Sequence, residues 1–321
     1  MRYKFIDLAK GICILLVIMI HVGVPEYMPG LYAAKVPIFF VLAGLFFLKS
    51  VNGGGYFRKK IYSLLVPFLT FYIISYSIFY ILEYLLSINI TNGLRFSITD
   101  VIHQRNLFNG PLWFLLCLFE VEVLFWALWK FIKNESLKAI IVLAIATVGF
   151  TLAHFEIFLP AWLDTACVAA LYFYLGILLS KSKYIYATIK PQWLMVGACM
   201  LYLIFILFPV AISMSTNHYS NPILAVISGT AIVGCILCIC KLVDDIAIIT
   251  WIGTNSLVLL CTHHLIYRPI KYLQIYLGYE SSLLLFALTM IVEIPVVILI
   301  NRYFPLLTGQ WRKKTLCVQR T

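Results

Sequence analysis

The stretch KGICILLVIMIH, residues 10–21, places a lysine and a histidine at the two ends of a run of large apolar residues. Such a run predicts a membrane-spanning helix, in which an ionisable side chain is costly and usually faces the protein interior or a water-filled cavity. Lys10 and His21 are eleven positions apart, which is about three helical turns and about 16 Å along the axis. The stretch therefore predicts one helix face that joins a cation to a deep imidazole.

The composition of the whole chain agrees with a membrane protein. The 321 residues are 63% hydrophobic and only 12% charged, and the mean hydropathy is +0.99. Soluble domains carry about 25% charged residues. We therefore expect an all-α integral membrane protein with the lipid bilayer as its surroundings. The net charge of +11 would point to nucleic acid in a soluble protein. Here we expect no nucleic-acid partner.

Ten transmembrane helices are expected, within a single domain over residues 1–321 and without an internal repeat. A span needs about 20 mostly apolar residues. The expected spans lie near 5–24, 36–50, 61–86, 111–129, 138–155, 162–180, 192–213, 222–240, 247–266 and 281–300. The opening MRYK resembles the start of a signal peptide, but Lys10, His21 and the lack of a small-residue cleavage site favour a retained first span.

The distribution of Lys and Arg predicts the orientation of these helices, because cytoplasmic loops carry an excess of both residues. With a cytoplasmic N-terminus, 19 of the 24 fall on the inner side. The outer side carries only Lys35, Arg95, Arg105, Arg268 and Lys271. Both termini are therefore expected in the cytoplasm. The expected location is the inner (cytoplasmic) membrane of the cell, which the chain would cross several times.

Cysteine usage predicts neither a disulfide framework nor a metal site. The nine cysteines are scattered through apolar runs, where cysteine behaves as a small hydrophobe. The run CILCIC, residues 235–240, has no interleaved histidine or acid to complete a metal site. We expect no metal cofactor.

A second candidate imidazole lies in WIGTNSLVLLCTHHLI, residues 251–266. His263 is expected in the outer half of its helix, at the depth of His21, so the two could meet across one cavity. A neutral histidine can abstract a hydroxyl proton near physiological pH. Glu120, which shares a helix face with Trp113, is a candidate to orient a histidine. The alternatives stay open: Lys10 snorkels to the interface, His263 bonds a backbone carbonyl, or Glu120 is a buried protonated acid.

The segment FRKK, residues 57–60, carries three consecutive cations at the expected cytoplasmic start of the third span. Arg58, Lys59 and Lys60 either only fix the topology or join Lys10 in binding the phosphates of a cytoplasmic donor through charge-assisted bonds.

An ordered set of short motifs resembles the membrane acyltransferase type 3 family, closest to its fucose 4-O-acetylase-like branch of surface polysaccharide O-acetyltransferases. The opening RYKFIDLAKGICILLVIMIH contains the basic residue, ten residues and histidine of that family, here Lys10 and His21. The resemblance continues through VPIFFVLAGLFF (36–47), FRKKIYSLLVPF (57–68), GPLWFLLCLF (110–119), YFYLGILLSK (172–181) and WIGTNSLVLLCTHH (251–264).

The resemblance implies about ten spans and an enzyme that transfers an acyl group, commonly acetyl, from cytoplasmic acyl-CoA to a hydroxyl of an envelope or surface glycan. It carries over to Lys10, His21, Arg58, Trp113 and His263. This chain departs from the family at Lys35-Val36-Pro37, where relatives often have His-Met-Pro, at Ala43, where they often have serine, and at Lys10, where many have arginine. The first departure leaves the choice of acceptor open.

The sequence thus predicts an integral-membrane O-acyltransferase. Its donor is acetyl-CoA or another acyl-CoA, its acceptor is a glycan, and polysaccharide-synthesis enzymes are candidate partners. The expected catalytic residues are His21, as general base or as transient carrier of the acyl group, together with His263 and Glu120. Donor binding is assigned to Lys10, Arg58, Lys59 and Lys60, and sugar binding to Trp113. The alternatives are a transporter or flippase for a glycan or its lipid-linked precursor, and a scaffold that has lost activity.

Overall fold

In the computed structural model, the described residues are 3–27, 30–52, 54–86, 107–182 and 188–308, together with Thr99 and Ile102. Several basic residues on which the predicted orientation depends lie outside this part of the chain. They are Arg2, Arg95, Arg105, Lys183, Arg312, Lys313, Lys314 and Arg320.

The fold is helical apart from one small hairpin. Its helices are α1 (Lys4–His21), α2 (Pro37–Val51), α3 (Tyr56–Lys60), α4 (Val66–Leu86), α5 (Trp113–Phe131), α6 (Glu135–His154), α7 (Leu163–Lys181), α8 (Pro191–Leu207), α9 (Pro222–Val243), α10 (Ala247–Thr254), α11 (Ser256–Tyr276) and α12 (Ser282–Tyr303). A π-helical segment, η2 (Ile61–Leu65), joins α3 to α4. Short 3-10 segments are η1 (Leu31–Ala34), η4 (Gly110–Leu112), η5 (Pro160–Trp162) and η7 (Pro305–Thr308). In the hairpin, β1 (Ile212–Ser213) pairs antiparallel with β2 (His218–Tyr219).

Polar caps and prolines define several helix starts. The side chains of Asn134, Asn221 and Ser281 accept hydrogen bonds from backbone N–H groups three residues on, at the starts of α6, α9 and α12. These bonds satisfy N–H groups that have no partner within the helix. Pro191 and Pro222 occupy the first positions of α8 and α9, where the missing N–H costs nothing.

Seven helices of the described chain are long and apolar enough to cross a membrane. They match seven of the expected spans: 36–50, 61–86, 111–129, 138–155, 162–180, 222–240 and 281–300. The other three differ from a simple span. The helix over 5–24 is α1, with charged Lys4, Asp7 and Lys10, and α8 ends at Leu207 and not at 213. The ten-span count therefore stays a prediction, as does the placement of the termini.

The expected span 247–266 is two helices, since the chain bends at Asn255. The φ of Asn255 is −110° and its ψ is 13°, outside the helical range. Its side-chain N–H₂ donates to the Trp251 carbonyl at 2.8 Å, and Asn301 of α12 donates to its Oδ1 at 2.7 Å. These bonds hold the bend in place. The second helix, α11, then continues ten residues past the predicted end.

Large apolar side chains cover the outer surface of the molecule. Ile73 of α4, Ile140 of α6, Met200 of α8 and Ile291 of α12 are each more than half exposed. Extensive exposed apolar surface is unusual for a soluble monomer and is expected where helices face lipid. The protein is a multi-pass membrane protein with an apolar perimeter.

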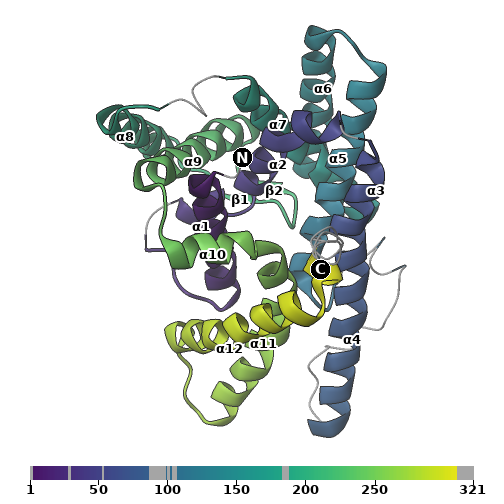
Figure 1. The fold of residues 1–321 in the computed structure, drawn as a ribbon, viewed down its shortest axis with the longest axis vertical. Helices are drawn as coiled ribbons and strands as arrows, with labels where there is room; N and C mark the ends of the chain where they lie inside the picture. Colours follow the sequence, from purple (N-terminus) through teal and green to yellow (C-terminus); the bar gives the residue numbers. More distant parts are fainter. Residues whose placement is uncertain are drawn as a thin grey trace, which may run out of the picture.

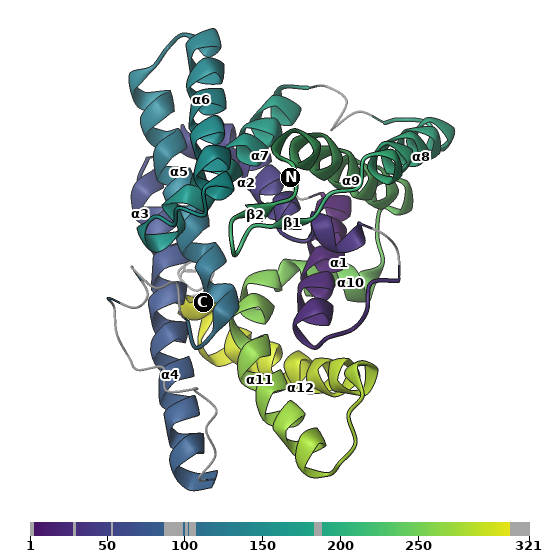
Figure 2. The same cartoon turned by 180° about the vertical axis from the view of Figure 1, so that it is seen from behind.

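Helix α1 lies beside α10, between α9 and α12 (Figures 1 and 2), and most of its residues are buried. It contacts α9, α10 and α11, while the long column of α3, η2 and α4 stands on the far side of the molecule beside α5. Helices α2 and α7 pack closely through two glycines. A Cβ on Gly44 would lie 1.9 Å from the Phe173 carbonyl oxygen, and one on Gly176 would lie 2.0 Å from that of Val41. Small residues at this crossing let the two backbones touch.

Candidate active site

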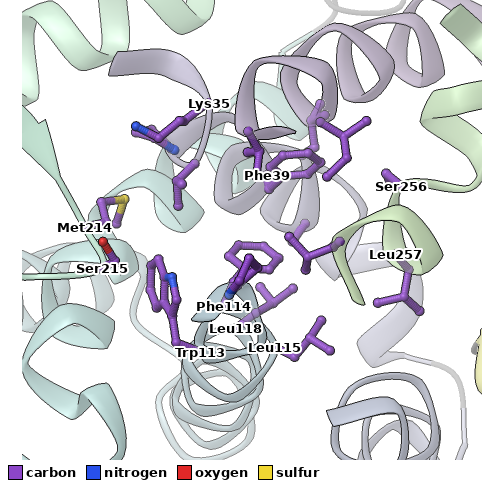
Figure 3. Close-up of a pocket in the computed structure, with 18 of the residues that line it drawn as sticks. Lys35, Phe39, Trp113, Phe114, Leu115, Leu118, Met214, Ser215, Ser256 and Leu257 are labelled. Carbon is purple, nitrogen blue, oxygen red and sulfur yellow. The ribbon is translucent and has the colours of Figure 1, made fainter. Parts of the chain in front are cut away.

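A cavity of about 740 Å³ connects the N-terminal helix with α2, α5, the β-hairpin and the start of α11. Lys10 and His21 both line it, so the predicted helix face borders one continuous space. Figure 3 shows Lys35, Met214, Ser215 and Trp113 around one side and Ser256 and Leu257 around the other. A cavity of this size accommodates a small-molecule substrate.

At one end of the cavity, His21 of α1 meets two histidines of α11. Its ring centroid lies 5.3 Å from that of His263 and 4.7 Å from that of His264. Nδ1 of His21 lies 3.3 Å from Nε2 of His264. We call His21, His263 and His264 the histidine cluster. The structure thus brings together His21 and His263, while their catalytic roles remain predictions.

The hydrogen bonds of His263 fix its tautomer. Its Nδ1 lies 2.7 Å from the carbonyl oxygen of Leu259, one helical turn earlier. A carbonyl oxygen only accepts, so Nδ1 carries the hydrogen and Nε2 carries the lone pair. The ring is fully buried, and among the described residues Nε2 has no hydrogen-bond partner. The carbonyl contact left open by the sequence is therefore present, and it coexists with the approach to His21.

His264 is the functional candidate that sequence reasoning passed over. It is 5% exposed and sits edge to face with His21. Neighbouring helical positions are about 100° apart, yet the rings of both histidines lie against that of His21. The side chain of His21 is long enough to reach both. The doubled histidine in the sequence was the available signal.

Lys10 lies toward the other end of the cavity. Its Nζ is 3.5 Å from Oδ1 of Asp7, one turn earlier on α1. Close packing against α10 holds this part of α1: a Cβ on Gly11 would lie 2.0 Å from the Ile249 carbonyl oxygen, and one on Gly253 would lie 1.7 Å from that of Asp7. The glycine after Lys10 therefore permits a helix contact that fixes the height of the lysine.

Only one of the three cations in FRKK lines the cavity. Lys60 forms a salt bridge with Glu122 of α5, and the Tyr56 hydroxyl donates to the same carboxylate. Tyr56 and Lys60 are four residues apart and share the inward face of the helix. Arg58 and Lys59 point elsewhere and are exposed. Neither lines the cavity, and their predicted part in binding a cytoplasmic donor stays a prediction.

The acid that reaches the cavity is Glu122 and not the predicted Glu120. Two residues on a helix differ by about 200°, so only one of the two can face inward at this level. Leu118 and Glu122, one turn apart, line the cavity. Glu120 lies on another face of α5 and does not line the cavity. Glu120 shares a helix face with Trp113, but Trp113 is the first residue of α5 and reaches the cavity from the helix end. The shared face therefore does not bring Glu120 to the cavity.

Aromatic rings line the cavity beside the hairpin. Trp113 lines it, while its sugar-binding role stays a prediction, and its ring centroid is 6.3 Å from that of Trp162. The indole N–H of Trp162 donates to the Ser215 carbonyl at 3.1 Å, which ties the hairpin to the cavity wall. Lys35, at the position where the chain departs from the family pattern, also lines this region.

The family model described as "Acyltransferase domain" matches residues 3–302. Curated proteins and solved structures gave no significant match. The matched range includes the cavity, both of its ends and the bend at Asn255, so the family pattern and the site coincide. The chain belongs to the membrane acyltransferase type 3 family and is a membrane acyltransferase.

Proposed function

We propose that the protein is an O-acyltransferase that takes an acyl group, in the first place acetyl, from cytoplasmic acyl-CoA and passes it to a hydroxyl of an envelope or surface polysaccharide. The observation that carries this proposal is the single cavity lined by Lys10 and Lys60 as well as by His21 and Trp113. One space can therefore hold a charged donor and a neutral hydroxyl acceptor at the same time.

The donor would enter from the side of Lys10 and Lys60. Both termini, and these two lysines, would face the cytoplasm of a ten-span protein in the inner membrane, which agrees with the excess of Lys and Arg assigned to that side. The phosphates of CoA would lie against the two ammonium groups through charge-assisted hydrogen bonds. The long thiol arm would then run along α1, and the thioester would reach His21.

His21 would act as the general base. Its Nδ1–H would donate to Nε2 of His264, which leaves Nε2 of His21 to take the proton of the acceptor hydroxyl. The hydroxyl oxygen would attack the thioester carbonyl, a C–O bond would form and the C–S bond would break. The departing CoA thiolate would receive the proton from His21. His264 would hold the ring of His21 in place, as the third member of a nucleophile, base and orienting group does.

The acceptor would occupy the side of the cavity that Trp113, Trp162 and Lys35 line. Flat aromatic rings suit the apolar faces of a sugar, and the serine and threonine groups of the hairpin offer hydrogen bonds. Glu120 has no part in this mechanism, since it does not line the cavity. His263 would help to hold the ring of His21 in position through the contact between the two rings.

Transfer of label separates an enzyme from a glycan transporter. Purified protein in lipid would be given acetyl-CoA labelled in the acetyl group, together with isolated envelope polysaccharide. We expect label on the glycan in a form that mild alkali releases, as an ester does. Succinyl-CoA, offered in the same assay, tests the donor. Movement of glycan across a vesicle membrane without any label on it would contradict the proposal.

A further inference from the structure

The histidine cluster has the composition and spacing of a metal site. One ring nitrogen from each of His21, His263 and His264 lies within 4.8 Å of those of the other two. The three rings come from α1 and α11, which are separated by most of the chain and packed together. Imidazole is a preferred ligand of zinc, copper and nickel ions. The cluster therefore offers three neutral ligands of one kind to one point in space.

The hydrogen bond of His263 is the arrangement that orients a metal ligand. Its Nδ1–H donates to the Leu259 carbonyl at 2.7 Å, which directs the lone pair of Nε2 away from its own helix. Metal-bound histidines usually make such a bond with their second ring nitrogen. Nε2 of His263 is buried and, within the described residues, unpartnered. A buried acceptor without a donor is an incomplete site that a cation would complete.

The distances within the cluster are close to those that a bound ion requires. Zn²⁺ holds imidazole nitrogens at about 2.0–2.1 Å, so tetrahedral ligands lie about 3.3 Å apart. Nδ1 of His21 and Nε2 of His264 are 3.3 Å apart. The ligand nitrogen of His263 lies within 4.8 Å of those of the other two rings. His21 lines the cavity, so the fourth ligand position would open into it, as it does at zinc sites with three protein ligands.

We propose that His21, His263 and His264 bind one divalent transition-metal ion, with Zn²⁺ as the foremost candidate, and that this ion inhibits acyl transfer. The inhibitory part rests on the proposed function. An ion bound to Nδ1 of His21 leaves the ring hydrogen on Nε2, so Nε2 has no lone pair with which to take the proton of the acceptor hydroxyl. The ion and the reaction therefore compete for the same histidine.

The surrounding charges favour an exchangeable ion. The cluster contains three imidazoles and no carboxylate. Lys35 and Arg268 add positive potential at His21. Both features weaken the hold on a dication compared with a site that contains an acidic ligand. We therefore expect an ion that a chelator removes without unfolding the protein.

Metal binding is tested on the full chain in detergent, purified without a polyhistidine tag and without any acyl donor. Co²⁺ serves as the spectroscopic probe, because its visible absorption reports tetrahedral nitrogen ligands, and Zn²⁺ is titrated by calorimetry. We expect one ion per chain. His264→Gln and His263→Ala should each weaken binding about 100-fold, because each removes a ligand. Losing only a residue that orients a ligand already costs about 10-fold to 100-fold in affinity.

The exposed histidines of the same chain provide matched controls. His154 ends α6 and His218 lies in β2, and both are exposed. His154→Ala and His218→Ala should bind Co²⁺ like the unaltered protein. Elution of each variant as a folded particle on size exclusion separates a lost ligand from a lost fold. Absent binding, or equal binding by folded His264→Gln and His263→Ala, would overturn the proposal.

Inhibition is tested by titrating Zn²⁺ into the acyl-transfer assay. Transfer should fall along the binding curve measured by calorimetry and return when a chelator is added. The residual activity of His264→Gln should need about 100-fold more Zn²⁺ for the same inhibition, in proportion to its weaker binding. Unchanged or increased transfer at saturating Zn²⁺ would overturn the inhibitory role. Transfer that is absent under all conditions would contradict the proposed function alone, because Co²⁺ binding is measured without a donor.

Discussion

Nδ1 of His21 lies 3.3 Å from Nε2 of His264, and the two rings meet edge to face although 243 residues separate them in the sequence. This contact ties the end of α1 to the middle of α11, at the edge of the cavity. It gives the predicted base a partner that can fix its ring orientation. The proposed mechanism therefore depends on both helices, and not on α1 alone.

Loss of His264 tests this dependence. We expect His264→Ala to lower kcat about 10-fold to 100-fold with little change in the KM for acetyl-CoA, because a hydrogen bond to a group that becomes charged contributes roughly 1.5–3 kcal/mol. His264→Gln should recover part of the loss, since its amide oxygen can accept from Nδ1–H of His21. The measurement is steady-state transfer of labelled acetyl to glycan.

The test of His264 needs a control and an outcome that would exclude a role for His264 in catalysis. His154→Ala, at the exposed end of α6, serves as the control and should match the unaltered protein. Equal loss in the Ala and Gln variants, with a parallel rise in KM, would indicate a packing role only.

Replacing Lys10 and replacing Lys59 should have different effects on donor binding, although both lysines lie near the expected cytoplasmic side. Lys10 lines the cavity, whereas Lys59 is exposed and does not. Lys10→Ala should raise the KM for acetyl-CoA about 10-fold or more, the equivalent of one lost charge-assisted hydrogen bond. Lys10→Arg should keep the affinity, because a guanidinium also binds phosphate. Lys59→Ala should change the KM little. Equal effects of Lys10→Ala and Lys59→Ala would contradict the placement of the donor.

The salt bridge between Lys60 and Glu122 predicts a stability effect separate from donor binding. Glu122 is 1% exposed, so Lys60→Met leaves a buried carboxylate without its cation. We expect a loss of about 3 kcal/mol in the free energy of unfolding, at the lower end for a broken buried pair because the lysine is partly exposed. Adding Glu122→Gln should restore most of it. The measurement is denaturation in mixed micelles.

A control variant defines the background for this effect. Lys59→Met, on the exposed face of α3, should lie within about 0.5 kcal/mol of the unaltered protein. If Lys60→Met costs no more than Lys59→Met, the pair does not stabilise the fold.

The ion pair between Lys4 and Asp245 predicts the pH dependence of the junction between α1 and α10. Lys4 Nζ lies 2.7 Å from Oδ2 of Asp245, and the Thr250 hydroxyl donates to Oδ1 at 2.6 Å. The hydrogen bonds from Lys4 and Thr250 lower the pKa of Asp245, and the bond to Asp245 raises the pKa of Lys4. The stabilisation is therefore complete only between the unfolded-state values, about pH 4 and about pH 10.

The sign of this dependence sets the experiment. Because the pKa of Asp245 is lowered in the folded state, its contribution is present above about pH 4 and is lost as the pH falls through the lowered value. Asp245→Asn should lower the Tm slightly at pH 7, and the gap from the unaltered protein should narrow as the pH falls below about 4. Asp244→Asn, which removes only a weaker charge interaction with Lys4, should lower the Tm less than Asp245→Asn does. A gap that does not narrow at all as the pH falls below about 4 would contradict the assignment.

The sequence predicted the structure well where residue spacing within a single helix decides which side chains share a face. The spacing of Lys10 and His21 predicted that both share one face, and both line the cavity. It was less informative where two elements meet. The bend at Asn255 depends on the side chain of Asn301, 46 residues later, which periodicity within one segment does not reveal.

The choice between neighbouring candidates was the main limit of the sequence. Glu120 and Glu122, and likewise His263 and His264, are equivalent by composition and differ only in direction on the helix. Direction depends on how α5 and α11 are rotated against their neighbours, which tertiary packing sets. The inward face of α3 shows the same limit, since Lys60 points to the cavity and Arg58 and Lys59 do not.

The central claim is that His21 removes the proton from the acceptor hydroxyl. The most direct measurement is transfer of labelled acetyl from acetyl-CoA to isolated envelope polysaccharide by His21→Ala, with His154→Ala as the control and with insertion of both variants verified in the membrane. We predict that His21→Ala transfers at least about 100-fold less label, the usual contribution of a general base, while it still binds acetyl-CoA. Label reaching the glycan at the rate of the unaltered protein would contradict the claim.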